Sequence, residues 1–373
     1  MSQAQRHARW QSEAMQRGWP AWRRRPLAAV YGVLVLLRQL AFRLGWLKVS
    51  RLPVPVLVVG NLVVGGAGKT PTVLSLTEHL RRRGWQPGVI SRGHGRRGSG
   101  VREVCLQTPV TESGDEPALI RRRSGVPVFV GADRVAAGQA LLAAHPDVDL
   151  LLCDDGLQHL ALHADVSVAV FDERGVGNGW LLPAGLLREP WPPGRWARMP
   201  DLVLVQHRED RPPPEVDCPA PVPCFHGRRR LGGSATDTDG RSVPLRDLAA
   251  APFAAVAGLA QPQRFFDMLR AQGCVPERTW ALADHAPREA YAPVLAAGLP
   301  VVCTEKDRPK LAEVRRAGDP AVWAVALELD IDPAFFDALQ ARLPAPPSRT
   351  GARTGQAAPG SGALSSPHGH QTA

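Results

Sequence analysis

Residues 54–83 read VPVLVVGNLVVGGAGKTPTVLSLTEHLRRR, and this stretch decides the fold. Its apolar, β-branched beginning at 54–59 predicts a buried strand, and its end at 71–83 predicts a helix. The turn between them is rich in glycine and closes with Gly-Lys-Thr at 68–70. Glycines allow backbone N–H groups to converge on phosphate oxygens, and the amino end of the following helix adds partial positive charge. The stretch therefore predicts a phosphate-binding loop of the P-loop type.

The loop contains the candidate ligands of a nucleoside triphosphate. In a P-loop the lysine bridges the β- and γ-phosphates and the next hydroxyl binds Mg²⁺, which assigns these roles to Lys69 and Thr70. The usual first glycine, six residues before the lysine, is Val63 here. A glycine-rich turn that merely precedes a helix is the alternative, but Gly-Lys-Thr between a strand and a helix favours the nucleotide. The predicted nucleotide-binding residues are Gly65, Gly66, Ala67, Gly68, Lys69 and Thr70.

A second group of metal ligands is predicted where another buried strand ends. Residues 149–155 read DLLLCDD, an apolar run with two carboxylates, Asp154 and Asp155, at its end. Such a run is common by itself, but a P-loop requires a strand-end carboxylate for its metal. We therefore expect Thr70, Asp154 and Asp155 to hold Mg²⁺ directly or through water.

Lysine is rare in this chain. Of 45 Lys and Arg residues only four are lysines, at positions 48, 69, 306 and 310. A chain that uses arginine almost everywhere has kept lysine at Lys69, where a slim ammonium must reach a phosphate.

The rest of the chain predicts two α/β/α domains. Strand and helix alternate over 51–206, which favours a P-loop NTPase-like domain with a mostly parallel sheet. The alternation of strands and helices resumes over 251–343, which predicts a smaller α/β domain. Residues 207–250 are proline-rich and polar and predict a linker, with a β-ribbon or hairpin near 237–241. Residues 344–373 consist mainly of Pro, Gly, Ser and Ala and predict a disordered tail.

The amino-terminal 50 residues predict a basic, membrane-associated helix. Residues 1–51 contain ten Lys and Arg but one acid, Glu13, so they carry nearly all of the net charge of +10. The remainder is almost neutral, which argues against a general nucleic-acid binder. The apolar run 27–37 is shorter than the roughly 20 residues that span a bilayer. Continued to 47, it suits a helix lying in the membrane interface. A signal peptide is the rival interpretation, but no small-residue cleavage site follows and export would separate the loop from ATP.

Several further motifs, in order along the chain, resemble one family. The matching segments are Val-Gly-Asn-Leu with Gly-Gly-x-Gly-Lys-Thr-Pro within 59–71, Ser-Arg-Gly-His-Gly at 91–95, Gly-Asp-Glu-Pro at 114–117, Asp-Arg-Val at 133–135, Asp-Asp-Gly-Leu-Gln-His at 154–159, Gly-Asn-Gly-x-Leu-Leu-Pro-Ala-Gly-x-Leu-Arg-Glu-Pro at 177–190, Asp-His at 284–285 and Thr-Glu-Lys-Asp at 304–307. By these segments the chain resembles the tetraacyldisaccharide 4′-kinases over about residues 31–339, and that family also lacks the early glycine replaced here by Val63.

The resemblance implies a function and roles for individual residues. It implies transfer of the γ-phosphate of ATP, with Mg²⁺, to the 4′-hydroxyl of the tetraacyldisaccharide 1-phosphate precursor of lipid A. Asp115 would receive the hydroxyl proton, and His285 from the second domain would pair with it. The residues implied to line the substrate cleft are Arg134, Gln158, His159, Arg188 and Glu189. The expected location is the cytoplasmic side of the inner membrane, as a peripheral or monotopic protein, and no obligate protein partner is evident.

Other interpretations stay open at this level. From the residues alone, Asp115 is more simply a helix N-cap before Pro117, and His285 is a satisfied loop histidine. On the same level Arg134 pairs with its neighbour Asp133 and Arg188 with Glu189 on the surface. The arginines at 121–123 and 228–230 are then solvated charge runs. The family has Tyr where this chain has His94, and His where it has Ala286. A membrane-associated regulatory P-loop ATPase and a nucleotide-binding adaptor without turnover are the functional alternatives.

Overall fold

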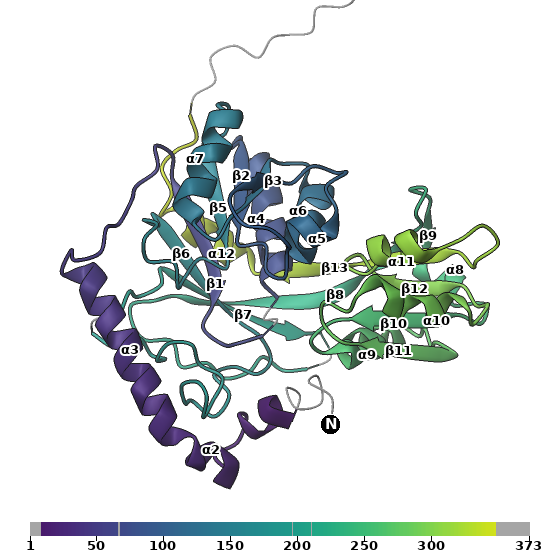
Figure 1. Ribbon diagram of the computed structural model, residues 1–373, viewed down its shortest axis with the longest axis horizontal. Helices are drawn as coiled ribbons and strands as arrows, with labels where there is room; N and C mark the ends of the chain where they lie inside the picture. Colours follow the sequence, from purple (N-terminus) through teal and green to yellow (C-terminus); the bar gives the residue numbers. More distant parts are fainter. Residues whose placement is uncertain (1–8, 66–67, 196, 210, 348–373) are drawn as a thin grey trace, which may run out of the picture.

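The computed structural model describes residues 9–65, 68–195, 197–209 and 211–347. Helices and strands gather into two lobes, with a pair of long strands running between them (Figure 1). We call the larger lobe the first unit and the smaller lobe the second unit.

The first unit is a mostly parallel sheet with helices on both faces. Its elements are β1 Val56–Asn61, α4 Lys69–Arg82, β2 Pro87–Ser91, β3 Arg102–Glu103, α5 Val110–Ser113, α6 Asp115–Ser124, β4 Val128–Val130, α7 Arg134–Ala144, β5 Leu150–Asp154, β6 Val166–Phe171 and β7 Leu202–Arg208. β1 pairs in parallel with β5 and β6, and β2 pairs in parallel with β4 and β5. Leu57 and Val59 of β1 pack in the core formed with α4, whereas Val56 and Val58 pack in the core formed with α7. Burial on both faces explains why these strands are continuously apolar in sequence.

The second unit repeats this layering on a smaller scale. Its elements are β10 Ala254–Gly258, α9 Pro262–Ala271, β11 Arg278–Leu282, the 3₁₀ helix η1 Arg288–Tyr291, α10 Ala292–Leu295, β12 Val301–Thr304 and α11 Arg308–Val314. Ala255 and Ala257 of β10 pack with α9, and Ala254 and Val256 face the core on the opposite side, which contains Tyr291. The predicted fold class is confirmed: two α/β/α arrangements, of which the carboxyl-terminal one is smaller.

Two long strands, β8 Cys224–Thr236 and β13 Val322–Ile331, join the units. β8 runs parallel to β7 and antiparallel to β13, and β13 runs parallel to β12. Within the described residues the strands thus form one 13-stranded sheet, ordered β11-β10-β12-β13-β8-β7-β6-β1-β5-β2-β4-β3, with β9 paired to β8 off this path. Because β8 and β13 are antiparallel, the parallel strands of each unit point toward the other unit. Ligands of such sheets bind outside the carboxyl ends of the strands, so the topology places a site between the units.

The predicted linker contains more regular structure than expected. The hairpin near 237–241 is present, with Asp237 N donating to Arg241 O at 2.9 Å, and it leads into β9 Ser242–Pro244 and α8 Leu245–Leu248. However, residues 224–236 form a central strand of the whole sheet. Its pairing with β7 and β13 stabilises this strand, although its sequence contains three arginines and three glycines.

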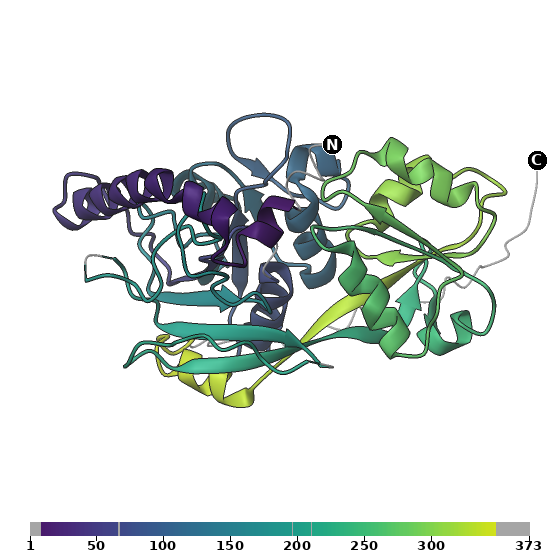
Figure 2. The same cartoon turned by 90° about the horizontal axis from the view of Figure 1, so that it is seen from below.

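The last helix, α12 Pro333–Gln340, lies before the predicted end of the second domain at 343 but belongs to the first unit. β13 carries the chain back from the second unit to the first, as Figure 2 shows for the yellow segment. Phe335 and Leu339 are consequently buried in the same core as Leu57 and Leu76 of the first unit. The first unit is therefore built from segments near both ends of the described part of the chain.

We expect Phe335→Ala to lower the free energy of unfolding by about 3–5 kcal/mol, the usual cost of removing a fully buried aromatic ring. Phe335 is 0% exposed and packs edge to face on Phe225 of β8. Chemical denaturation followed by circular dichroism measures this change. Phe336→Ala, which removes a partly buried ring next to it, is the control and should cost clearly less. Equal stability of Phe335→Ala and the wild type would contradict this packing.

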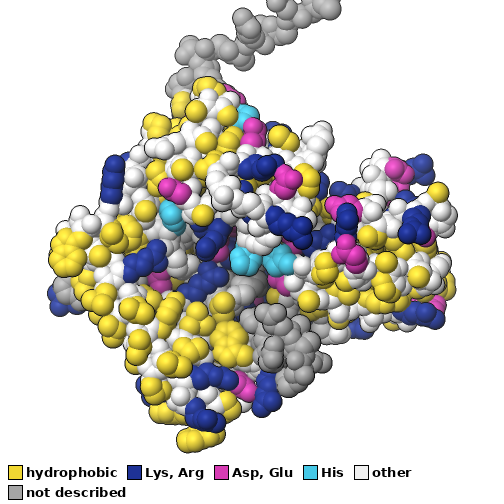
Figure 3. All heavy atoms as spheres, viewed as in Figure 1, with side chains coloured by type: hydrophobic (Ala, Val, Ile, Leu, Met, Phe, Trp, Pro, Cys, Tyr) yellow, Lys and Arg dark blue, Asp and Glu magenta, His cyan; other side chains and the backbone are white. Residues whose placement is uncertain are grey.

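The amino-terminal segment forms α2 Trp19–Arg23 and α3 Arg25–Arg43 along the first unit. Among the described residues, α3 is the one helix that is long and apolar enough to cross a membrane. Little of it is buried. Its exposed apolar side chains include Leu27, Val30, Leu34 and Leu37. Figure 3 shows hydrophobic side chains gathered over this side of the molecule. Of the predicted tail, residues 348–373 lie outside the described residues.

Candidate active site

The glycine-rich turn follows β1 and leads into α4. Gly65 and Gly68 have φ angles of +94° and +75°, a region that glycine occupies without steric cost. A Cβ atom on Gly68 would overlap the Oε1 atom of Gln206, so glycine is required there. Gly66 and Ala67, predicted to bind the nucleotide, lie outside the described residues.

Lys69 lies next to a strand-end carboxylate, as its predicted role requires. Its Nζ donates to Asn61 Oδ1 at 3.0 Å and is 3.1 Å from Asp155 Oδ1. Asn61 Nδ2 in turn donates to the carbonyl oxygens of Val63 and Gly65 at 2.5 and 3.1 Å. Asn61 thus shapes the turn and orients the lysine, a contribution that sequence reasoning did not assign.

The two carboxylates at the end of β5 have opposite electrostatic surroundings. Asp154 is buried, and burial raises its pKa to about 6; Ser91 Oγ donates to its Oδ2 at 3.0 Å. Burial alone would also raise the pKa of Asp155, but Lys69 and Arg188 outweigh it, and the pKa is lowered. Asp155 also has a positive φ of 54°. Such a backbone conformation is uncommon outside glycine and occurs often at functional sites.

These carboxylates fit a hard divalent cation. The Oδ1 atom of Asp154 is buried and has no hydrogen-bond partner among the described residues. Thr70 lies in the first turn of α4, on the cavity described below. No group of three His, Cys, Asp or Glu side chains suited to a metal occurs in the described part of the chain. A Mg²⁺ ion would therefore take Asp154, Asp155 and Thr70 together with water and phosphate oxygens, which is how Mg²⁺ usually binds.

Three of the residues predicted to bind substrate surround Asp155. Arg188 Nη1 is 3.1 Å from Asp155 Oδ1 and donates to Gln158 Oε1 at 3.2 Å. Arg134 Nη2 donates to the backbone oxygen of Asp155 at 3.3 Å. Arg134 is buried and its neighbour Asp133 caps α7 instead, so the two do not form the simple pair considered above. Arg188 thus contacts the Asp155 carboxylate, Arg134 contacts the Asp155 backbone, and Gln158 is held beside them by Arg188.

The remaining two predicted substrate residues lie farther out. His159 Nε2 is 4.0 Å from Asp133 Oδ1, and burial lowers its pKa. Glu189 Oε2 accepts a hydrogen bond from Gln39 Nε2 of α3 at 3.0 Å. Glu189 thereby connects the rim of the site to the amino-terminal helix rather than forming a surface pair with Arg188.

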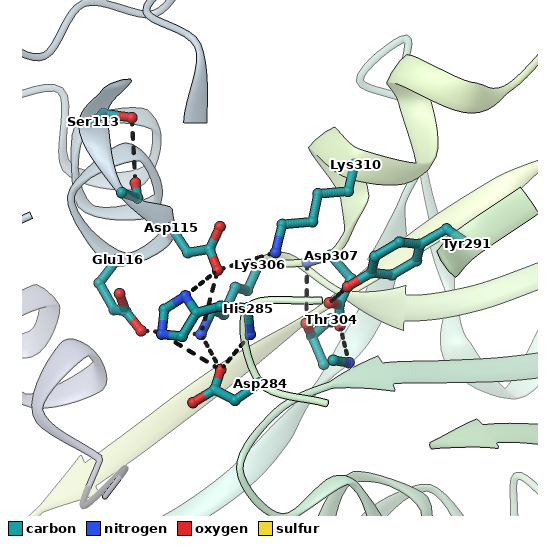
Figure 4. Close-up of polar contacts among 12 residues, drawn as sticks. Ser113, Asp115, Glu116, Asp284, His285, Tyr291, Thr304, Lys306, Asp307 and Lys310 are labelled. Atoms are coloured by element: carbon teal, nitrogen blue, oxygen red, sulfur yellow. Dashed lines mark hydrogen bonds and ion pairs between the residues drawn. The ribbon is translucent and has the colours of Figure 1, made fainter. Parts of the chain in front are cut away.

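Asp115 contacts the second unit and does not cap its helix. It is the first residue of α6, with Gly114 at the N-cap and no side-chain capping bond. Its Oδ2 lies 2.8 Å from His285 Nδ1 (Figure 4). Burial would raise the pKa of Asp115, but His285, Lys306 and Lys310 lower it to about 2. The hydrogen bond to Asp115 raises the pKa of His285. The predicted pair across the two units is therefore present.

Sequence reasoning missed the two lysines at this pair. Lys310 Nζ donates to Asp115 Oδ2 at 3.1 Å, and Lys306 Nζ lies 3.6 Å from the same oxygen. Thus three of the four lysines in the chain contact carboxylates of this site. The scarcity of lysine was the signal that could have found them.

One cavity between the units is lined by residues of the phosphate-binding loop and by neighbours of the Asp115–His285 pair. Thr70 of the first unit and Lys306 and Asp284 of the second line this cavity of about 210 Å³, together with Glu116. Histidine, basic and acidic side chains gather where the two lobes meet (Figure 3). The facing strand ends of the two units therefore bring the phosphate-binding loop and the residues next to Asp115 and His285 to the same cavity.

The two departures from the family pattern have defined places. His94 packs edge to face on the His285 ring, with centroids 5.6 Å apart. Ala286 is buried in the core of the second unit. His94 thus lies directly against the histidine of the Asp115–His285 pair.

Comparison with known proteins gives a consistent result. A family profile described as LpxK, tetraacyldisaccharide-1-P 4′-kinase, matches residues 20–344. A tetraacyldisaccharide 4′-kinase from Acidovorax sp. (strain JS42) is 49% identical over 318 residues, which cover 85% of this chain and 89% of that protein. The corresponding protein of Polaromonas naphthalenivorans (strain CJ2) is 47% identical over 359 residues, covering 95% and 96%.

A solved structure agrees with these relatives. The crystal structure described as the "apo" form of LpxK from Aquifex aeolicus in complex with ATP superposes with a TM-score of 0.73 and 27% identity. The match covers 87% of this chain and 99% of that one. The chain therefore belongs to the tetraacyldisaccharide-1-phosphate 4′-kinase (LpxK) family.

Proposed function

We propose that this protein transfers the γ-phosphate of ATP to the 4′-hydroxyl of tetraacyldisaccharide 1-phosphate, the precursor of lipid A. One observation carries the proposal beyond family membership. Gly68 and Thr70 of the phosphate-binding loop line one cavity together with Glu116 and Asp284, the sequence neighbours of the Asp115–His285 pair. This arrangement suits in-line transfer from a bound triphosphate to an activated hydroxyl.

The first unit binds the nucleotide. Gly65, Gly68 and the amino end of α4 direct backbone N–H groups at the phosphates, and the Lys69 ammonium moves from Asp155 to the β- and γ-phosphates. Thr70, Asp154 and Asp155 would hold Mg²⁺, which would supply positive charge to the phosphate oxygens. Arg134 and Arg188 add positive charge at the same place.

Asp115 receives the proton of the acceptor hydroxyl. A carboxylate with a pKa of about 2 is a weak base, so its contribution depends on position as well as on basicity. His285 holds the carboxylate from the second unit. Movement of the second unit therefore acts directly on the group that orients the acceptor.

The acceptor reaches the site along α3. Three polar side chains of this helix contact the rim of the site: Arg38 Nη2 donates to Gln158 O at 2.6 Å, Gln39 binds Glu189, and Tyr31 Oη donates to Arg188 O at 2.9 Å. The same helix also exposes leucine and valine side chains. A helix that contacts the site and exposes apolar side chains can lie in a membrane interface and present a lipid headgroup to the site. The basic amino-terminal segment suits the anionic cytoplasmic face of the inner membrane.

We expect the double substitution Leu34→Ser and Leu37→Ser to weaken binding to vesicles of anionic phospholipid by about tenfold or more, because each exposed leucine contributes apolar burial in the bilayer. The two side chains are 60% and 56% exposed. Vesicle sedimentation measures the effect. Val275→Ser removes an equally exposed apolar side chain from the second unit and should not change it. Unaltered sedimentation of the α3 variant would contradict the proposed orientation.

Phosphate transfer itself separates the proposed function from its alternatives. The protein is incubated with γ-³²P-labelled ATP and tetraacyldisaccharide 1-phosphate, and the lipid is extracted. A kinase labels the lipid, whereas a regulatory ATPase releases phosphate without labelling it and an adaptor does neither. Labelled phosphate without labelled lipid would overturn the proposal.

A further inference from the structure

Lys306 and Lys310 approach Asp115 in a specific way. The nearest contacts of His285, Lys306 and Lys310 with this carboxylate all go to Oδ2, at 2.8, 3.6 and 3.1 Å. None of the hydrogen bonds found among the described residues involves Oδ1. Figure 4 shows the three nitrogens gathered around one oxygen, while the other points away from them.

We propose that Lys306 and Lys310 are positioning residues that fix the Asp115 carboxylate through Oδ2 and leave Oδ1 for the acceptor hydroxyl. This inference rests on the proposed function, in which Asp115 receives the proton of the lipid hydroxyl. Without these contacts the two oxygens of Asp115 would be equivalent. Rotation of the carboxylate would then move Oδ1 away from the hydroxyl whose proton it accepts. Small displacements of this kind lower rates strongly.

The chemistry of the two basic side chains explains why lysine stands at both positions. An ammonium is a compact point charge that several neighbours can share around one oxygen. A guanidinium is a planar fork that binds both oxygens of a carboxylate in parallel. Arginine at 306 or 310 would therefore engage Oδ1 as well as Oδ2. In a chain with four lysines among 45 basic residues, this difference accounts for two of the exceptions.

The second unit holds both lysines rigidly. They lie on either side of Asp307, whose buried carboxylate accepts from Tyr291 Oη at 2.5 Å, Thr304 Oγ1 at 2.6 Å and Gly258 N at 3.0 Å. These bonds fix the turn from β12 into α11. Lys306 precedes Asp307 in this turn, and Lys310 lies one helical turn later in α11.

Lys306 also joins the two units around Asp115. Its Nζ donates to Glu116 Oε1 of α6 at 3.0 Å and to Asp284 Oδ1 at 2.7 Å. Asp284 adjoins His285, so the same ammonium connects α6 with the turn that carries the histidine. The charged and titratable groups that face Asp115 are His285, Lys306 and Lys310, with Arg122 and Tyr291 farther away.

The first test replaces each lysine by arginine and keeps its charge. We expect Lys306→Arg and Lys310→Arg each to lower kcat for lipid phosphorylation about tenfold or more, with little change in KM for ATP, because only the orientation of the acceptor group is lost. Arg288→Lys, a basic exchange at an exposed ion pair of the same unit, is the matched control and should keep wild-type kcat. Wild-type kcat in both lysine variants would overturn the inference.

A second measurement applies even if an arginine variant folds poorly. In Lys306→Met with Lys310→Met, the burial of Asp115 is no longer offset by two ammoniums, so the pKa of this carboxyl rises. The reaction requires the ionised form, so the acid limb of the kcat profile moves to higher pH, although the His285 hydrogen bond still lowers this pKa. A purely structural role would lower kcat at all pH values without moving this limb, and that result would overturn the inference.

The two proposals fail in distinguishable ways. Absence of lipid labelling by the wild-type protein contradicts the proposed function. Labelling by the wild type together with an unchanged pH profile and unchanged kcat in the variants contradicts only the positioning role of the lysines.

Discussion

Asp115→Asn is expected to lower phosphate transfer to the lipid by about 10²–10⁴-fold, the range usual for loss of a proton-accepting group, while ATP stays bound. Asparagine keeps the shape of the side chain, but its amide cannot accept the proton that leaves the acceptor hydroxyl. The phosphate-binding loop and its lysine belong to a different cluster and are unchanged. Transfer of ³²P to extracted lipid and equilibrium binding of a fluorescent ATP analogue measure the two effects separately.

The control for this variant is Asp330→Asn. It removes an exposed carboxylate that pairs with Arg228 on the joining strands, far from the proposed chemistry, and should keep full transfer. Lipid labelling by Asp115→Asn at the wild-type rate would show that another group receives the proton. Loss of both transfer and ATP binding would point instead to collapse of the contact between the two units.

Lys69→Met is expected to lower kcat by about 10²–10³-fold, comparable to the loss of one preorganised donor to a developing negative charge. It should also weaken ATP binding, because the ammonium contacts the nucleotide before and during transfer. Lys69→Arg should not restore activity, since the wider guanidinium does not fit beside Asn61 and Asp155. Single-turnover transfer and ATP titration provide the two measurements.

A thermal melt without nucleotide serves as the control for Lys69→Met. Methionine removes the charge that offsets the partly buried Asp155, but Arg188 remains on that carboxylate, so folding should persist. A Lys69→Met variant that binds and consumes ATP like the wild type would contradict the assignment of this loop to the phosphates.

The local part of the site could be predicted from sequence because its signals are local. A strand, a glycine turn and Gly-Lys-Thr determine the phosphate-binding loop within about 15 residues. The end of β5 identifies Asp154 and Asp155 by the same logic. The convergence of Asp155 with Lys69 then follows from the parallel pairing of β1 with β5.

The contacts between units could not be derived in this way. Asp115 and His285 are 170 positions apart, and only the family resemblance paired them. The strand β8 could not be predicted from sequence, because its stability comes from long-range pairing with β7 and β13 rather than from its own composition. Arg229 illustrates the consequence: it lies between two exposed arginines of one basic run, yet it is buried and pairs with Glu173 at 2.9 Å.

The joining strands also determine how the cavity can open and close. β8 and β13 form a hydrogen-bonded ribbon between the units, and its register shifts between Val325 and Leu327, opposite Gly232 and Gly233. A ladder of this kind resists shear along the strands but bends across its plane, most easily at such an irregularity. The ribbon therefore bends mainly in one direction, and its two strands slide little along each other. His285, Lys306 and Lys310 must therefore approach or leave Asp115 together, as one rigid group on a single arc.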